Sequence, residues 1–138
     1  MKIMIDTNVI LDFFLSREPH ASAAKQLFEM VCQEKIEAFT TASSVTDIYY
    51  IIAKRLGDAT ARKAIQQLLN IIGVIAVDGD DCTNALNLPI PDFEDTLIIV
   101  CVNKQTIDCI ISNDKAFLQV KPEFANVVDT QKFLEQSS

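Results

Sequence analysis

Short apolar runs of strand length alternate along the sequence with longer segments of helical periodicity. The expected strands cover 2–5, 37–40, 74–77, 108–111 and 125–128. The expected helices begin near 22 and at 44, 59, 81, 92, 115 and 130. Such alternation is typical of parallel β-α-β units, in which right-handed crossovers place helices on both faces of a sheet. The sequence therefore predicts an α/β fold: a three-layer α/β/α sandwich with a central parallel sheet of about five strands.

Length and composition favour one folded domain. The 138 residues are 49% hydrophobic, so the whole chain, 1–138, is expected to form a single domain around one core. No apolar run approaches the length that spans a bilayer. Asp6 and Asp12 interrupt the N-terminal apolar stretch 1–15, which argues against a secretory signal. We therefore expect a cytoplasmic protein that has no membrane partner.

Several classes of functional site lack their sequence signals. The four cysteines are Cys32, Cys82, Cys101 and Cys109. They form no C-x-x-C pair and have no histidine nearby, so we expect reduced and mostly buried thiols. The lone histidine, His20, follows Pro19 at a helix start and is expected to be exposed, which leaves a Ser-His-Asp triad without support. Three glycines in the whole chain also exclude a Gly-rich phosphate-binding loop.

The charged residues at first argue against a nucleic-acid partner. The net charge is −7, whereas proteins that bind nucleic acids usually present a basic surface. Two basic pairs, Lys54-Arg55 and Arg62-Lys63, border the turn between two expected helices, and such groups are more often solvated helix ends than phosphate sites. Arg17 and Lys115 are better placed to contact a phosphate backbone, because Arg17 follows the acidic residues Asp6 and Asp12 and Lys115 directly follows Asp114.

Four aspartates are expected at the carboxyl edge of the sheet, where parallel sheets bind their ligands. Asp6 and Asp114 follow the first and fourth strands, and Asp47 and Asp95 fall in the first turns of helices. Each has a structural explanation as a helix cap, a capping-box acid or a partner of a helix dipole. Their convergence indicates more, because like charges gathered in one pocket need a cation to remain ionised.

A pocket of carboxylates favours the hard cations Mg²⁺ and Mn²⁺. Such an ion can lower the pKa of an attacking water and shield the charge of a phosphodiester. The acidic pocket therefore predicts metal-assisted hydrolysis of phosphodiester bonds. The net charge then no longer excludes RNA, since the four acids would be largely neutralised by metal. RNA binding should be weak without the metal, and a protein partner is expected to present basic groups to this pocket.

The four aspartates stand in recognisable segments. These are Met4-Ile5-Asp6-Thr7-Asn8-Val9-Ile10-Leu11-Asp12, Thr46-Asp47-Ile48-Tyr49-Tyr50, Pro91-Asp92-Phe93-Glu94-Asp95-Thr96-Leu97, and Ile111-Ser112-Asn113-Asp114 with Phe117. Together they resemble the four acidic motifs of PIN-domain ribonucleases. The resemblance covers nearly the whole chain and extends to the small single-domain members, such as the VapC-type toxins of prokaryotic toxin–antitoxin pairs.

The resemblance implies a role for each matching residue. It assigns the catalytic and metal-binding carboxylates to Asp6, Asp47, Asp95 and Asp114. Asn8 would orient ligands or water beside the metal, and Thr7 would also support the pocket from outside the ligand set. Asp92 would be either a fifth carboxylate or only the N-cap of the helix that contains Asp95.

Two residues depart from the family pattern. Family members usually carry Glu where this chain has Asp47, and the missing methylene shortens its reach to a metal. An acid often precedes the phenylalanine of the last motif, whereas Ala116 stands there, so that motif depends on Asp114 alone. These departures motivate an alternative function, a catalytically weakened PIN-like module that binds RNA or a protein.

The main implication is an endoribonuclease that depends on Mg²⁺ or Mn²⁺, acts as the toxin of a pair and is inhibited by a small antitoxin protein. Residues 48–53 are apolar all round an expected helix, which indicates either a homodimer surface or a core helix covered on two sides. A phosphatase with Asp6 as nucleophile is disfavoured, because Asn8 stands where a second acid would be needed.

Overall fold

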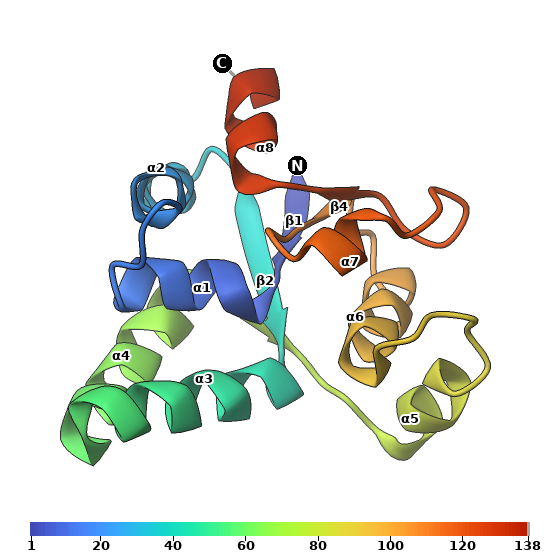
Figure 1. The fold of residues 1–138 in the computed structure, drawn as a ribbon, viewed down its shortest axis with the longest axis horizontal. Helices are drawn as coiled ribbons and strands as arrows, with labels where there is room; N and C mark the ends of the chain where they lie inside the picture. The colour runs from blue at the N-terminus through green and yellow to red at the C-terminus, as the bar shows by residue number, and fades with distance from the viewer. Residues whose placement is uncertain (138) are drawn as a thin grey trace.

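The computed structural model describes residues 1–137 and contains a five-stranded parallel sheet (Figure 1). Its strands are β1 (Lys2–Ile5), β2 (Glu37–Thr41), β3 (Gly73–Ile75), β4 (Cys109–Ile111) and β5 (Val127–Val128). They lie in the order β3-β2-β1-β4-β5, which makes β1 the central strand. The predicted parallel sheet is confirmed, although β3 and β5 are shorter than expected.

The helices divide between the two faces of this sheet. They are α1 (Thr7–Phe14), α2 (Ala21–Cys32), α3 (Ala42–Leu56), α4 (Asp58–Ile71), α5 (Gly79–Ala85), α6 (Phe93–Asn103), α7 (Lys115–Leu118) and α8 (Thr130–Ser137). Figure 1 shows α1 to α4 gathered on one side of the strands and α5 to α7 on the other. No helix within residues 1–137 is long and apolar enough to cross a membrane.

The central strand β1 separates two buried clusters. Ile3 and Ile5 belong to the cluster that includes residues of α1 to α4 and α8, whereas Met4 belongs to the cluster that includes α6 and α7. Successive side chains of a strand point to opposite faces of the sheet, so both faces of β1 are covered. The predicted three-layer α/β/α arrangement is therefore confirmed.

The start of α3 differs from its prediction. The sequence favours a capping box at residues 44–47, but α3 begins at Ala42, and its N-cap is Thr41, whose Oγ1 accepts a hydrogen bond of 3.1 Å from the Ser44 backbone N–H. Asp47 consequently lies in the second turn of α3 and has no capping role. α3 ends at Leu56, and Gly57 follows it with a φ of 91°, a backbone conformation that glycine adopts without strain.

Gly73 is the first residue of β3, two residues after the end of α4. A Cβ atom at this position would lie 2.7 Å from Cδ1 of Phe39, which is on the neighbouring strand β2. The glycine is therefore explained by the close approach of an aromatic ring across the sheet.

Three further predictions have mixed outcomes. Cys101 and Cys109 are buried as expected, but Cys32 and Cys82 are exposed on α2 and α5; all four are free thiols. His20 is exposed at the start of α2, as predicted. The helix over 48–53 is covered on one side only, since Ile48 and Ile52 are buried in α3 whereas Tyr50 and Ile51 are exposed.

Candidate functional site

Acidic side chains from several elements meet at the carboxyl ends of the strands. Asp6 directly follows β1, Asp114 lies three residues beyond β4, Asp47 comes from α3, and Asp92, Glu94 and Asp95 stand at the start of α6. These six carboxylates line one cavity of about 400 Å³, together with Thr7, Asn8, Leu11, Tyr50 and Ile51. We call this cavity the acidic pocket. It gathers every carboxylate that the sequence predicted for the site.

Asp6 is the most constrained member of the acidic pocket. Its side chain is 5% exposed. Oδ1 accepts a hydrogen bond of 2.8 Å from the Thr7 backbone N–H, and Oδ2 accepts bonds from Asn8 Nδ2 at 2.9 Å and from the Ser112 hydroxyl at 2.7 Å. Burial raises the pKa of Asp6, the nearby charge of Asp114 raises it further, and the hydrogen bonds oppose both effects.

Asn8 joins the ends of β1 and β4. Besides donating to Asp6, its Nδ2 lies 3.3 Å from Ser112 Oγ, and its Oδ1 accepts a bond of 3.0 Å from the Asn113 backbone N–H. Ser112 Oγ in turn accepts a bond of 3.1 Å from the Asp114 backbone N–H. One side chain and one hydroxyl thus fix the spacing between Asp6 and Asp114. Asn8 lines the acidic pocket and positions its acids through these hydrogen bonds.

Asp92 and Asp114 serve as helix caps while they line the acidic pocket. Asp92 Oδ1 accepts the backbone N–H groups of Glu94 and Asp95 at 2.9 and 3.2 Å, at the start of α6. Asp114 Oδ1 accepts the Ala116 N–H at 2.9 Å, at the start of α7. Each cap uses one carboxylate oxygen, which leaves Oδ2 available to a ligand. The capping and functional explanations of these residues are therefore compatible.

Asp95 lies at the centre of the acidic charges and is 6% exposed. Its pKa is raised to about 7 by burial, the largest cause, together with the charges of Asp92, Asp6, Asp114 and Glu94. These contributions show that carboxylates distant in sequence act on one another electrostatically. The acidic pocket therefore favours either a proton or a cation near neutral pH.

Glu94 is a site residue that sequence reasoning missed. Its pKa is raised to about 7. Burial is the largest cause, and the charge of Asp47 and a hydrogen bond with Asp47 add to it. The Thr7 hydroxyl also lies 3.5 Å from Glu94 Oε1. The sequence does show Glu94 as a further acid beside Asp92 and Asp95 at the start of α6. Whether its side chain faces the pocket depends on how α3 packs against the site. Glu94 brings a longer side chain to the side of the pocket where the shorter Asp47 stands.

Ser112 is the second residue that was missed. Its side chain is fully buried, and its hydroxyl contacts both Asp6 and the backbone of Asp114. The signal was a small hydroxyl residue directly after a buried strand, at the edge where Asp6 was expected. The sequence alone does not reveal this role of Ser112, because the distance between β1 and β4 follows from strand pairing, which joins Ile5 to Ile111.

The two predicted RNA-contacting cations lie outside the lining of the acidic pocket. Arg17 Nε forms an ion pair of 2.9 Å with Asp12 Oδ1, and Arg17 Nη2 donates a hydrogen bond of 3.0 Å to the Asn8 carbonyl oxygen. Arg17 thereby stabilises the first acidic segment. Lys115 is exposed at the start of α7, directly beside Asp114. The basic residues of the α3–α4 turn, Lys54, Arg55, Arg62 and Lys63, are exposed.

The donor chemistry of the acidic pocket fits a hard divalent cation. The pocket offers carboxylate oxygens, and the raised pKa values of Asp6, Glu94 and Asp95 show the electrostatic pressure that a cation would relieve. Within residues 1–137, no three His, Cys, Asp or Glu side chains stand in a ready chelating arrangement. Asp6 is held by its hydrogen bonds, whereas Asp92 and Asp114 are exposed.

Comparisons with known proteins agree with this geometry. A sequence model of the PIN domain family matches residues 2–116. Ribonuclease VapC1 from Aquifex aeolicus (strain VF5) is 29% identical over 140 residues, which cover 98% of this chain and 94% of that protein. The match thus includes all of the acidic segments.

Solved structures share the fold. The VapBC2 complex from Rickettsia felis, bound to a DNA fragment from its promoter, has a TM-score of 0.68 and 14% identity over 94% of this chain and 98% of that chain. VapC20 from Mycobacterium tuberculosis, a toxin that cleaves the sarcin-ricin loop, has a TM-score of 0.67 and 16% identity over 83% of this chain and 92% of its own. Since the family model spans most of the sequence, this chain belongs to the PIN domain family.

Proposed function

We propose that this protein is a metal-dependent endoribonuclease, the toxin of a toxin–antitoxin pair, acting as one PIN-like domain over residues 1–138. One observation carries the proposal: carboxylates from the ends of β1 and β4 and from α3 and α6 line a single cavity. The resemblance of the chain to a ribonuclease over nearly its full length supports RNA as the substrate.

We assign Asp6, Asp47, Asp95 and Asp114 as the catalytic carboxylates and metal ligands, with Asp92 as a further ligand. Asp6 is held by three hydrogen-bond donors, so it is the fixed reference point of the site. The pKa of Asp95 is raised to about 7 in the metal-free protein, and a cation bound by its carboxylate would relieve this unfavourable charge. Thr7 and Asn8 orient the acids from outside the ligand set.

Ribonucleases of this family generally use divalent metal ions, and we propose Mg²⁺ or Mn²⁺ here. When bound, such an ion neutralises charge on the scissile phosphate and acidifies the attacking water. Without it, the six carboxylates repel an RNA backbone. Lys115, which is exposed and directly follows Asp114, and Arg17 are the cations that we assign to the RNA backbone.

We propose a small antitoxin protein as the inhibitory partner and a homodimer as the active assembly, in the cytoplasm. Complexes of the VapBC type among the structures with this fold support the antitoxin. Exposed apolar side chains on α3 and α4, among them Tyr50, Ile51, Leu56 and Leu69, support a protein interface on that side. The acidic pocket would accept basic groups of the antitoxin in place of metal and RNA.

The proposal is tested by incubating the purified protein with total RNA and Mn²⁺ beside an Asp6→Asn variant. We expect the wild-type protein to cut RNA and the variant to be inactive. Glu37→Gln is the matched control, because Glu37 is an exposed carboxylate at the opposite end of the sheet. Equal RNA decay with wild type and Asp6→Asn, or no decay of any RNA offered, would remove the catalytic assignment.

One observation favours a second function, a weakened PIN-like module that binds RNA or protein without cutting. The acids within residues 1–137 do not form a ready chelating set, and Asp47 stands where family members usually carry the longer Glu. Calorimetric titration with Mn²⁺ separates the two functions. Metal binding that is lost in Asp95→Asn supports the nuclease, whereas absence of such binding favours the module.

A further inference from the structure

A second cavity adjoins the acidic pocket and differs from it in chemistry. It has a volume of about 590 Å³ and lies between the α5–α6 loop and the α7–β5 loop. Its lining is mostly apolar and includes Ile90, Pro91, Val120 and Phe124. Ile90 and Val120 also pack against the buried cluster around α6, so the floor of this cavity is anchored to the core. We call it the apolar cavity.

The two cavities share a wall. Asp92 and Asp95 line both of them, so the acids at the start of α6 separate two parts of one continuous surface. A polymer whose phosphate lies at Asp95 would therefore place a neighbouring unit against the apolar side.

From this continuity, and resting on the proposed nuclease function, we propose that the apolar cavity binds one unpaired nucleobase of the RNA, next to the scissile phosphate. A base presents apolar faces that gain from contact with Phe124 and the ring of Pro91, and polar edges that need hydrogen-bonding partners. The rim supplies such partners in Gln119, Lys121 and Glu123, all of which are exposed.

The other large cavities do not share this relation to the acids. The cavity between α3 and α4 borders the acidic pocket only through Tyr50, and its arginine, Arg62, is paired with Asp58 at 3.0 Å. The cavity that contains Val31 and Ile71 lies at the amino ends of the strands, away from the acidic pocket. The apolar cavity alone among the three shares carboxylates with the site, which favours a substrate unit as its occupant.

The test uses methyl-labelled full-length protein with all carboxylates intact, at a temperature low enough that the probes are bound without being cut. The probes are dinucleoside monophosphates in the presence of Mg²⁺, with an abasic ribose phosphate and inorganic phosphate as controls. We expect saturable shifts of the Ile90 and Val120 methyl signals with the dinucleotides alone. The methyl groups of Val31 and Ile71, at the opposite end of the sheet, provide an internal control and should not shift.

A second variant fills the cavity. Ala116 is exposed on α7 and lines the apolar cavity, so Ala116→Phe places a ring there without disturbing the buried core. We expect it to weaken dinucleotide binding between about fivefold and about a hundredfold, the range for loss of one stacked base. The matched control is Cys32→Phe, which adds a ring to the cavity at the amino ends of the strands and should leave binding unchanged.

Three results would overturn the inference: no shift of Ile90 and Val120, equal shifts with the abasic phosphate, or unchanged binding in Ala116→Phe. Shifts caused by a co-purified antitoxin but not by dinucleotides would assign the cavity to a protein segment and also overturn it. Base binding without any RNA cleavage by the wild-type protein contradicts the proposed nuclease alone. Cleavage that depends on Asp6, without base binding, contradicts the apolar-cavity inference alone.

Discussion

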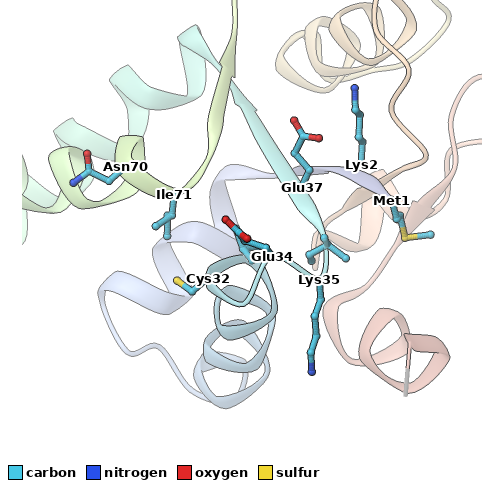
Figure 2. A pocket seen from close by; sticks show the side chains of 10 residues that line it. Met1, Lys2, Cys32, Glu34, Lys35, Glu37, Asn70 and Ile71 are labelled. Atoms are coloured by element: carbon cyan, nitrogen blue, oxygen red, sulfur yellow. The ribbon is translucent and has the colours of Figure 1, made fainter.

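The two ends of the sheet each carry a hollow lined by charged residues, and the two differ in how the charges are combined. The hollow at the amino ends has a volume of about 580 Å³ and combines Glu34 and Glu37 with Lys2 and Lys35 (Figure 2). The acidic pocket at the carboxyl ends is smaller, about 400 Å³, and has six carboxylates but no lysine or arginine among its described lining residues. Cavity size therefore does not identify the site in this protein, whereas unbalanced charge does.

The difference has a cause in the backbone. The carboxyl ends of parallel strands lead into helix N-termini, which attract carboxylates through their N–H groups and dipoles. Asp6, Asp92 and Asp114 all cap helices there, at the starts of α1, α6 and α7. Helix starts can thus gather several acids in one place, while a cation is still needed to balance them.

The largest expected effect is a difference in RNA cleavage between substitutions at the two ends of the sheet. Asp6→Asn should reduce RNA cleavage by about 10²- to 10⁴-fold, because it removes a fixed carboxylate from proton handling and metal binding. Glu37→Gln, at the amino ends, should retain wild-type activity. The measurement is the initial rate on total RNA with Mn²⁺. A similar loss in both variants would show that general destabilisation, and not the site, is being measured.

Metal binding should stabilise the protein through the acidic pocket alone. At a free Mn²⁺ concentration 100 times the Kd, the free energy of unfolding should rise by about 2.7 kcal/mol. Denaturant titrations with and without Mn²⁺ measure this increase. The increase should vanish in Asp95→Asn and persist in Glu37→Gln. Stabilisation that survives in Asp95→Asn would place the ion elsewhere.

Asn8→Ala tests whether the acidic pocket needs its acids held in position, because Asn8 positions them and carries no charge itself. We expect about a 10- to 100-fold loss in metal affinity or in cleavage rate, the range typical of partners that orient metal ligands. Asn8 donates to Asp6 and accepts from the Asn113 backbone, so the change loosens the spacing between Asp6 and Asp114. Isothermal titration with Mn²⁺ measures the affinity, and an unchanged Kd would contradict this positioning role.

The smallest effect is a dependence of metal-free stability on pH. Glu94 and Asp95 have a folded pKa of about 7, above their usual values, so the folded state binds more protons than the unfolded state between those values and 7. Stability should therefore fall as pH rises from 5.5 to 7.5, by on the order of 1 kcal/mol after solvent screening. Urea titrations at the two pH values measure the change, and Glu94→Gln should reduce it. Stability that increases over this interval would contradict the raised pKa values.

Local patterns were sufficient to predict most of the fold and part of the site. The strand before Asp6 and the acids at the start of α6 are predicted by residues that are neighbours in the sequence. The start of α3 was misplaced because Thr41 and Ser44 are both good cap residues, and only the end of β2 decides between them. Asp47 still reaches the acidic pocket, since one extra turn of α3 leaves it at the same end of the helix.

Contacts between distant elements account for what the sequence did not reveal. Glu94 becomes part of the site through Asp47, a residue on another helix, and Ser112 becomes part of it through the pairing of β1 with β4. The exposure of Cys32 and Cys82 likewise depends on which face of each helix meets the core. These features follow from packing between elements, which periodicity within one element cannot specify.

The strand order also has a consequence for biosynthesis. The central strand β1 precedes every other strand in the chain, yet its partner β4 begins only at Cys109, and Asp114 follows later still. A nascent chain that has not yet exposed these residues outside the ribosome lacks one neighbour of β1 and one wall of the acidic pocket. Under the proposed function, the nascent chain therefore cannot complete its acidic pocket, or cut RNA, until Asp114 has left the ribosome.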